Sequence, residues 1–350
     1  MPRPPTDQEL VNQATAALEH AIQSGERFPK KAATEQLGIN RSTFDHRIRL
    51  AQTTHDPERP LLPDLPDDDL DVEEIIEWQT RRFEKRIAHI ESRKWASIKM
   101  PDDKPFGVLL MGDPHVDDNF CNWSLLRHHC DIAKNTEGMY GANVGDTENR
   151  WVGRLMALWA QQDTSEGSAW KLAEWLFLES GVQWLVWILG NHDVWRDGAD
   201  RWKLVNRPQR VLLADWGAQF KLVSTNGTEF KIWMSHDFPG RSVYNSLHGP
   251  QRAAHMKEDA DLYIAGHTHN WALHQEESAS RGFVYWLARA RGYKWHDDHA
   301  LKFGHQPQQE GASIVSIFNP RSDSMAGRVQ CFSDVEVGAD FLTWLRRKSG

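Results

Sequence analysis

Several features are scarce or missing in this 350-residue chain, and each absence excludes a class of protein. No apolar run approaches the roughly 18 residues that a membrane-spanning helix needs, so we expect no membrane partner. The segment after Met1 is rich in proline and has no apolar stretch, so we expect no secretory signal. The three cysteines (Cys121, Cys130 and Cys331) have neither metal-type spacing nor an even disulfide framework. This fits a reducing compartment, and we expect a cytoplasmic protein.

An excess of positive charge is also missing. The formal net charge of −8 argues against a generally basic nucleic-acid binder, although it allows a local basic patch. The apolar fraction of 40% is enough to bury a substantial core, and most of the 17 tryptophans should lie in that core, since indoles bury large areas. The length predicts two domains, or one large domain with a small module.

Residues 1–55 predict a small all-α domain. Residues 7–24 have the apolar spacing of an amphipathic helix. Two shorter helical segments follow, 30–37 and 41–50, and the turn between them contains Gly38, which can adopt the left-handed backbone that such a turn needs. The pair resembles the helix-turn-helix of DNA-associated bacterial and phage proteins.

That resemblance implies that the second short helix contacts DNA. The expected contact residues are Arg41, Ser42, Thr43, His46 and Arg47. The alternative is a helical protein–protein module of the same shape. Glu35 and Asp45 weaken the electrostatic case for DNA.

An acidic, proline-rich linker is expected over residues 56–71, followed by a connecting helix over 72–98. Ile76, Phe83, Ile87 and Ile90 form one apolar stripe on this helix. The stripe could pair with a second copy, giving a homo-oligomer, or dock on the main domain. We favour docking because the stripe is short.

The main domain is expected over residues 99–335, with an amphipathic helix at 336–350 that docks on it. Short apolar runs that predict strands alternate with helical stretches such as 122–135 and 151–180. The runs are 106–111, 184–189, 230–234, 262–265, 283–287 and 313–318. Most of the early runs end in Gly, Asp, Asn or His, which is typical of an α/β enzyme whose site lies at the strand ends.

Metal-type ligands follow these strands. They are Asp113, His115, Asp146, Asn191, His236, His267 and His269. Asp113 and His115 are two residues apart in an extended segment, so both side chains can grip one ion. Imidazole, carboxylate and amide oxygen together suit borderline divalent ions and disfavour magnesium alone. We expect two divalent ions, manganese first, with iron, zinc, nickel or cobalt as alternatives.

Taken in order, these motifs resemble the signature of the calcineurin-like metallophosphoesterase family over about residues 105–320. The stretch 287–298 resembles a feature of the phage- and prophage-associated members of that family. The resemblance implies a two-sheet αββα sandwich in the cytoplasm of a bacterium or a phage-infected host. It also implies ligand sets: Asp113, His115 and His269 for one ion, Asn191, His236 and His267 for the other, with Asp146 between them. His192 would act as acid over the substrate phosphate, with Asp193 orienting it.

The function implied is a phosphodiesterase or nuclease that acts on DNA through metal-activated water. One alternative is a phosphomonoesterase or cyclic-nucleotide phosphodiesterase whose amino-terminal module mediates protein–protein contacts. Another is a catalytically dead DNA-binding protein, which the complete ligand set disfavours.

Polar side chains near the motifs are candidates for substrate contact. They are Arg150, Arg241, Asn245, Arg291 and Lys294. A structural ion pair is an equal alternative for Arg150, and an ordinary polar surface is an equal alternative for the others. Trp151, Trp195 and Trp271 follow motifs closely, and we favour ordinary packing for them over stacking on bases.

Overall fold

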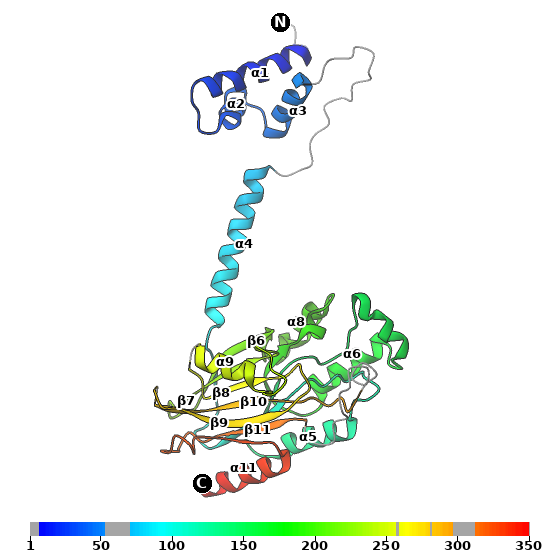
Figure 1. The fold of residues 1–350 in the computed structure, drawn as a ribbon, viewed down its shortest axis with the longest axis vertical. Helices are drawn as coiled ribbons and strands as arrows, with labels where there is room; N and C mark the ends of the chain where they lie inside the picture. Colours follow the sequence, from blue (N-terminus) through cyan, green and yellow to red (C-terminus); the bar gives the residue numbers. More distant parts are fainter. Residues whose placement is uncertain (1–6, 53–70, 257–258, 281, 297–311, 350) are drawn as a thin grey trace. The chain divides into compact units, whose positions relative to one another are not determined.

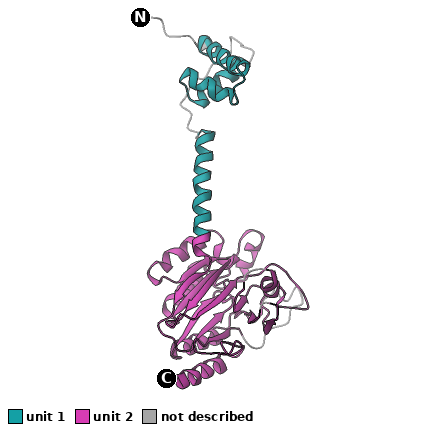
Figure 2. Cartoon of the chain, turned by 90° about the vertical axis from the view of Figure 1, so that its left-hand side faces the viewer, with its two compact units in different colours: residues 1–90 teal, residues 91–350 magenta. Residues whose placement is uncertain are grey.

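The computed structural model describes residues 7–52, 71–256, 259–280, 282–296 and 312–349. The chain divides into two compact units, residues 1–90 and 91–350 (Figure 2). Among the described residues, no helix has both the length and the apolar character to cross a membrane.

The first unit contains three short helices, α1 (Asp7–Gln23), α2 (Pro29–Leu37) and α3 (Arg41–Gln52). They enclose a small core of Ala14, Ala17, Ala33, Phe44 and Ile48. Gly38 ends α2 in the left-handed conformation, at a φ of 66°, and the Asn40 side chain accepts a hydrogen bond from the Thr43 amide at the start of α3. The helices expected in this region are therefore present. The expected linker lies outside the described residues, apart from Asp71.

A longer helix, α4 (Val72–Arg93), ends five residues earlier than the expected connecting helix. Trp95 adopts a positive φ of 54°, which a helix cannot continue through, and Ala96–Lys99 then forms strand β1. Residues 96–99 alternate between half-buried and exposed, as an edge strand does, and this short pattern was too weak to separate from the helix in the sequence.

The second unit is built on two mixed six-stranded sheets. The first has the order β1-β6-β7-β8-β10-β9 and the second β12-β11-β2-β3-β4-β5. The strands of the first are β1 (Ala96–Lys99), β6 (Gly217–Val223), β7 (Glu229–Ser235), β8 (Leu262–Ala265), β10 (Phe283–Arg289) and β9 (Ala272–Ser278). Those of the second are β12 (Val329–Phe332), β11 (Ile314–Phe318), β2 (Phe106–Met111), β3 (Met139–Asn143), β4 (Trp184–Leu189) and β5 (Leu212–Asp215).

The two sheets face each other across an apolar core and carry helices on their outer faces (Figure 1). Residues of both sheets, such as Val108, Ile188 and Ile232, share the central core. Helices α5 (Trp123–Asn135) and α11 (Val335–Ser349) cover the second sheet, and α9 (His248–Met256) covers the first. This confirms the αββα sandwich, a small all-α region preceding it, and an amphipathic helix at the end of the domain.

The helix expected over 151–180 is broken into three pieces. They are a 3-10 helix at Gly153–Gln161, α6 (Glu166–Glu174) and one π turn at Trp175–Glu179. Ser165 starts α6 as its cap, with its hydroxyl accepting from the Ser168 amide. The remaining helices are α7 (Asn191–Val194) and α8 (Gly198–Gln209).

Candidate metal centre

The expected ligands converge because the strands that precede them point the same way. β2, β3 and β4 are parallel neighbours, as are β7 and β8, so their carboxyl ends lie at common sheet edges. The loops after these strands are tied to each other by backbone hydrogen bonds, from the His115 amide to the Asp146 carbonyl and from the Gly266 amide to the His236 carbonyl.

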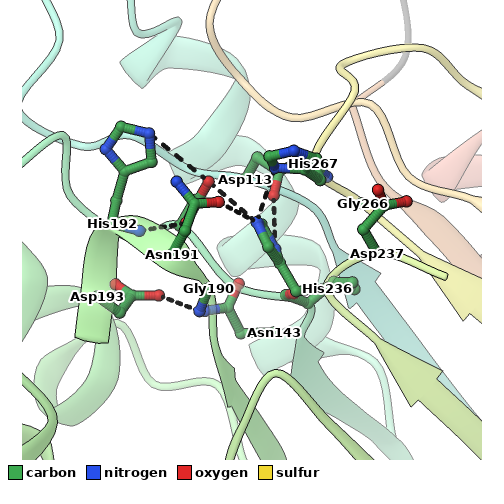
Figure 3. Close-up of polar contacts among 12 residues, drawn as sticks. Asp113, Asn143, Gly190, Asn191, His192, Asp193, His236, Asp237, Gly266 and His267 are labelled. Carbon is green, nitrogen blue, oxygen red and sulfur yellow. Dashed lines mark hydrogen bonds and ion pairs between the residues drawn. The ribbon is translucent and has the colours of Figure 1, made fainter. Parts of the chain in front are cut away.

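Four of the expected ligands form the centre of the cluster, and Figure 3 labels three of them, Asn191, His236 and His267. His236 Nε2 lies 3.1 Å from each of three atoms: Asp146 Oδ2, Asn191 Oδ1 and His267 Nδ1. Asp146, His236 and His267 meet the geometric requirement for a shared ion.

Asp113, His115 and His269 lie next to this centre. Asp113 Oδ1 is 3.5 Å from His236 Nδ1, and Asp113 Oδ2 accepts from the His267 amide at 2.6 Å. The His115 ring centroid is 5.1 Å from that of His269. All seven expected ligands are therefore gathered in one place.

The ligand loops are held in an unusual backbone conformation. Ten non-glycine residues in the described structure have positive φ, and five of them are expected ligands: Asp113, His115, Asp146, His267 and His269. Such conformations cost about 1–3 kcal/mol each and cluster at functional sites. Their concentration here indicates that the rest of the fold offsets an unfavourable backbone free energy in order to place these side chains.

Burial and charge perturb these groups strongly. Burial raises the pKa of Asp113 well above its usual range, and burial also lowers the pKa of His115. Burial alone would lower the pKa of His236, but the charge and hydrogen bond of Asp146 outweigh it and raise that pKa to about 10. Buried groups with strongly shifted pKa values in one cluster are a mark of a functional site.

The residues present fit a cation. His236 Nδ1 points at the Val144 carbonyl and carries a ring proton, and the raised pKa also keeps a proton on Nε2, which faces Asp146 Oδ2, Asn191 Oδ1 and His267 Nδ1. A cation bound among these atoms would take the place of the Nε2 proton. Asp113 Oδ1 and His115 Nδ1 are buried and have no hydrogen-bond partner in the part of the chain that the structure describes. Converging lone pairs and unpartnered buried acceptors are what a bound divalent ion would satisfy.

His192 lies beside the cluster and is half-buried. Its Nδ1 contacts the Asn149 carbonyl, which makes Nδ1 the protonated nitrogen and directs Nε2 toward Asp146 Oδ2, 3.9 Å away. Trp151 and Trp195 pack on the ring, with centroid distances of 5.2 and 4.3 Å. The two indoles are thus occupied in holding this histidine.

Asp193 does not orient His192, contrary to our expectation. Its carboxylate accepts from the amides of Thr147 and Gly190, both at 2.9 Å, and so joins the Asp146 loop to the Asn191 loop. A buried carboxylate that accepts from two backbone amides links the two loops and has a structural role. The group that orients His192 is a backbone carbonyl, which the sequence could not reveal.

Two of the five substrate candidates are buried cations that pair with carboxylates of the chain. Arg150 is 3% exposed and its Nη2 lies 2.7 Å from Asp197 Oδ1. This ion pair corresponds to the structural role given above as the alternative to substrate contact. Lys294 is 5% exposed and pairs with Asp118 at 2.7 Å. Both side chains are therefore held by carboxylates of the chain.

The other three candidates are less buried. Arg241 is exposed and its Nη2 lies 3.4 Å from His267 Nε2, beside the ligand cluster. Arg291 lies over the Trp271 ring at 5.8 Å. The Asn245 side chain accepts from the Leu247 amide in the turn before α9. Arg241 has the most suitable position for contact with a substrate.

The residues expected to contact DNA lie together on α3. Arg41 pairs with Asp45 at 3.1 Å, and Lys30 pairs with the same carboxylate at 2.9 Å. The hydrogen bonds of Arg41 and Lys30 lower the pKa of Asp45 despite its partial burial, which alone would raise it. Ser42 and Thr43 both bond to the Asn40 side chain, while His46 and Arg47 are half-buried further along the helix.

Sequence reasoning missed a polar support behind the Asp146 loop. Asp117 accepts from the Asn149 amide and from Gln162, and Asp118 accepts from the Asn149 side chain. The only sequence signal for this support is the pair of acidic residues that begins two positions after His115. In a single sequence such a pair looks the same as the acidic residues of any solvent-exposed loop. These contacts hold Asn149, whose carbonyl in turn holds His192.

No protein-family model matches this sequence, and no curated protein is similar to it at a significant level. Several solved structures match part of this chain. An NAD nucleotidase from Haemophilus influenzae is 9% identical, with 65% of this chain and 49% of that chain covered and a TM-score of 0.36, so this chain spans about half of its length.

Two further solved structures are similar over the same share of this chain. A novel archaeal phosphodiesterase is 14% identical, with 65% of this chain and 99% of that chain covered and a TM-score of 0.36. A metallophosphoesterase from Sphaerobacter thermophilus is 13% identical, with 65% and 87% covered and a TM-score of 0.33. Similarities of this size do not assign an activity to the chain.

Proposed function

We propose that this protein is a metal-dependent phosphoesterase, specifically a phosphodiesterase or nuclease that acts on DNA. The observation that supports it is the convergence of seven ligand-type side chains from the ends of five strands. Three of them, Asp146, His236 and His267, meet around a point that an ion could occupy.

Asp113, His115 and His269 would hold one divalent ion, and Asn191, His236 and His267 the other, with Asp146 shared. When bound, such a pair supplies Lewis-acid activation of water and neutralises charge on the phosphoryl oxygens. The donor set favours manganese, with iron, zinc, nickel or cobalt as alternatives.

The chain's own contribution is to place a proton donor beside that pair. His192 is anchored by the Asn149 carbonyl through Nδ1, so its Nε2 is directed into the site. From there a protonated His192 could give its Nε2 proton to the leaving oxygen of the ester. Arg241, next to His267, adds a positive charge where a phosphate would enter.

Hydrolysis of bis(p-nitrophenyl) phosphate with Mn²⁺ tests this proposal. We expect turnover in the wild type and its loss in Asp146→Asn, because the variant weakens the shared ligand. Full activity of Asp146→Asn would refute the metal assignment. A panel of plasmid, single-stranded DNA, cyclic dinucleotides and monoesters would then separate a nuclease from the phosphomonoesterase and cyclic-nucleotide alternatives.

The DNA part of the proposal depends on α3. The expected contact residues on this helix are polar but half-buried, and such side chains suit groove or phosphate contact. The pairing of Asp45 with both Lys30 and Arg41 neutralises part of the positive charge and favours the protein–protein alternative. Equal DNA affinity for the full chain and for a chain that starts at residue 71 would exclude docking through this helix. Pairing of α4 with a second copy stays a prediction, as does the cytoplasmic location.

A further inference from the structure

One buried arginine is in contact with three segments around the candidate metal centre. Arg289 is the last residue of β10 and is 3% exposed. Its Nε donates to the Ser246 carbonyl at 2.7 Å, and its Nη1 donates to the Gly266 carbonyl and to Thr268 Oγ1, the latter at 3.0 Å. Its Nη2 pairs with Asp237 Oδ1 at 3.2 Å.

Each of these contacts except the one to Ser246 is next to an expected histidine ligand. Gly266 and Thr268 flank His267, Thr268 precedes His269, and Asp237 follows His236. His267 and His269 have φ values of 68° and 52°, a backbone conformation that persists only where surrounding contacts impose it. Arg289 supplies two such contacts, to the residues on either side of His267.

The geometry requires a guanidinium. Its planar fork reaches a carbonyl, a hydroxyl and a carboxylate in fixed directions at once, whereas a lysine ammonium offers a single point of attachment. Because Arg289 is buried and its contacts are with the chain, it does not reach a substrate. A role for Arg289 must therefore act through the ligands.

We infer that Arg289 is a positioning residue that fixes His236, His267 and His269 in the arrangement that binds metal. The inference rests on the proposed function, since it assumes that these histidines are ligands. It assigns to Arg289 a part in metal affinity that is separate from its part in stability. Partners that orient ligands contribute about 10–100-fold in metal affinity.

Calorimetric titration of the metal-stripped full-length protein with Mn²⁺ tests this inference. We expect Arg289→Met and Arg289→Lys both to bind Mn²⁺ at least about 10-fold more weakly than the wild type. The matched control is Arg346→Met. Arg346 is also largely buried, with its side chain 11% exposed, and it bonds to the Pro105 carbonyl and Glu137 in a different part of the fold. It should lower the melting temperature and leave the Mn²⁺ affinity unchanged.

The possible results of this titration distinguish a failure of the inference on Arg289 from a failure of the proposed function. Wild-type affinity in Arg289→Met, or in Arg289→Lys if the methionine variant fails to fold, overturns the inference. An equal loss in Arg346→Met also overturns it, since the effect would then be a general one of a weakened fold. A wild type that binds no Mn²⁺ or other divalent ion refutes the proposed function itself.

Discussion

Gly190 and Asp146 approach each other so closely that there is no room for a side chain at position 190. Gly190→Ala tests this close approach. A Cβ at position 190 would lie 2.1 Å from Asp146 Oδ1 and 2.6 Å from the Asp146 amide nitrogen. Gly190 has a φ of −79° and a ψ of −175°, which alanine adopts freely. The effect of the added methyl group therefore comes from this contact and not from backbone strain.

The size of the effect follows from the distances. Ordinary contacts of a Cβ begin at 3.4 Å, so the methyl group and Asp146 Oδ1 must separate by about 1.3 Å. Both are buried in a packed region, and overpacking of this kind costs about 1–3 kcal/mol of folding free energy. A displacement of about 1 Å at a catalytic group costs about 100-fold in rate. We expect losses of these sizes in stability and in Mn²⁺-dependent turnover.

Turnover of bis(p-nitrophenyl) phosphate and chemical denaturation followed by tryptophan fluorescence measure the two effects. The control is Gly167→Ala in α6, where a Cβ meets nothing within 4 Å. It should keep full turnover and raise the stability by a few tenths of a kcal/mol to about 1 kcal/mol, since alanine is the better helix former. If Gly190→Ala behaves like Gly167→Ala, the described approach of the two loops is wrong.

Three further predictions follow from other contacts. His192→Gln should lower kcat by about 10²–10⁴-fold while Mn²⁺ binding, followed by calorimetry, stays intact; a variant with full kcat would exclude His192 as the acid. Burial lowers the pKa of His129 to about 4, so this residue favours the folded state only while its ring is neutral. Its contribution to the free energy of unfolding should be fully present above pH 6.5 and should fall by about 3 kcal/mol as the pH drops to 4. Denaturation curves of His129→Gln should lack this part of the pH dependence, and an unchanged dependence would contradict the prediction. Lys294→Met leaves Asp118 buried without its cation and should cost about 3–5 kcal/mol of unfolding free energy, as measured by denaturation; a change below 1 kcal/mol would show that the pair is solvated.

The strands with continuous apolar runs, and the ligand motifs, could be predicted from the sequence because both are recognised from neighbouring residues alone. Runs such as Phe106–Met111 and Trp184–Leu189 are fully or almost fully apolar, as strands buried on both faces must be. The ligands other than Asp146 follow predicted runs, and their order in the chain predicted the metal centre. Asp146 follows β3, whose sequence MYGAN is too mixed to predict a strand. Edge strands such as β1 and β12 are short and only half-buried, and they left no comparable signal.

The supporting contacts could not be read in the same way because they join residues far apart in the chain. Asp193 binds the amide of Thr147, 46 positions away, and Arg289 binds Asp237, 52 positions away. For Arg150 the sequence leaves an ion pair and a substrate contact equally open, and for neither Arg150 nor Lys294 does it show that the side chain is buried beside a distant carboxylate. Backbone carbonyls, such as the one of Asn149 that holds His192, carry no sequence signal at all.

The number of metal ions bound per chain is the measurement that most directly tests the account. Equilibrium dialysis against Mn²⁺ followed by elemental analysis should give two ions per chain for the wild type and fewer for Asp146→Asn, whose substitution removes the shared carboxylate. Zero ions per wild-type chain with Mn²⁺ and with the other four candidate metals, or the same number in both proteins, would contradict it.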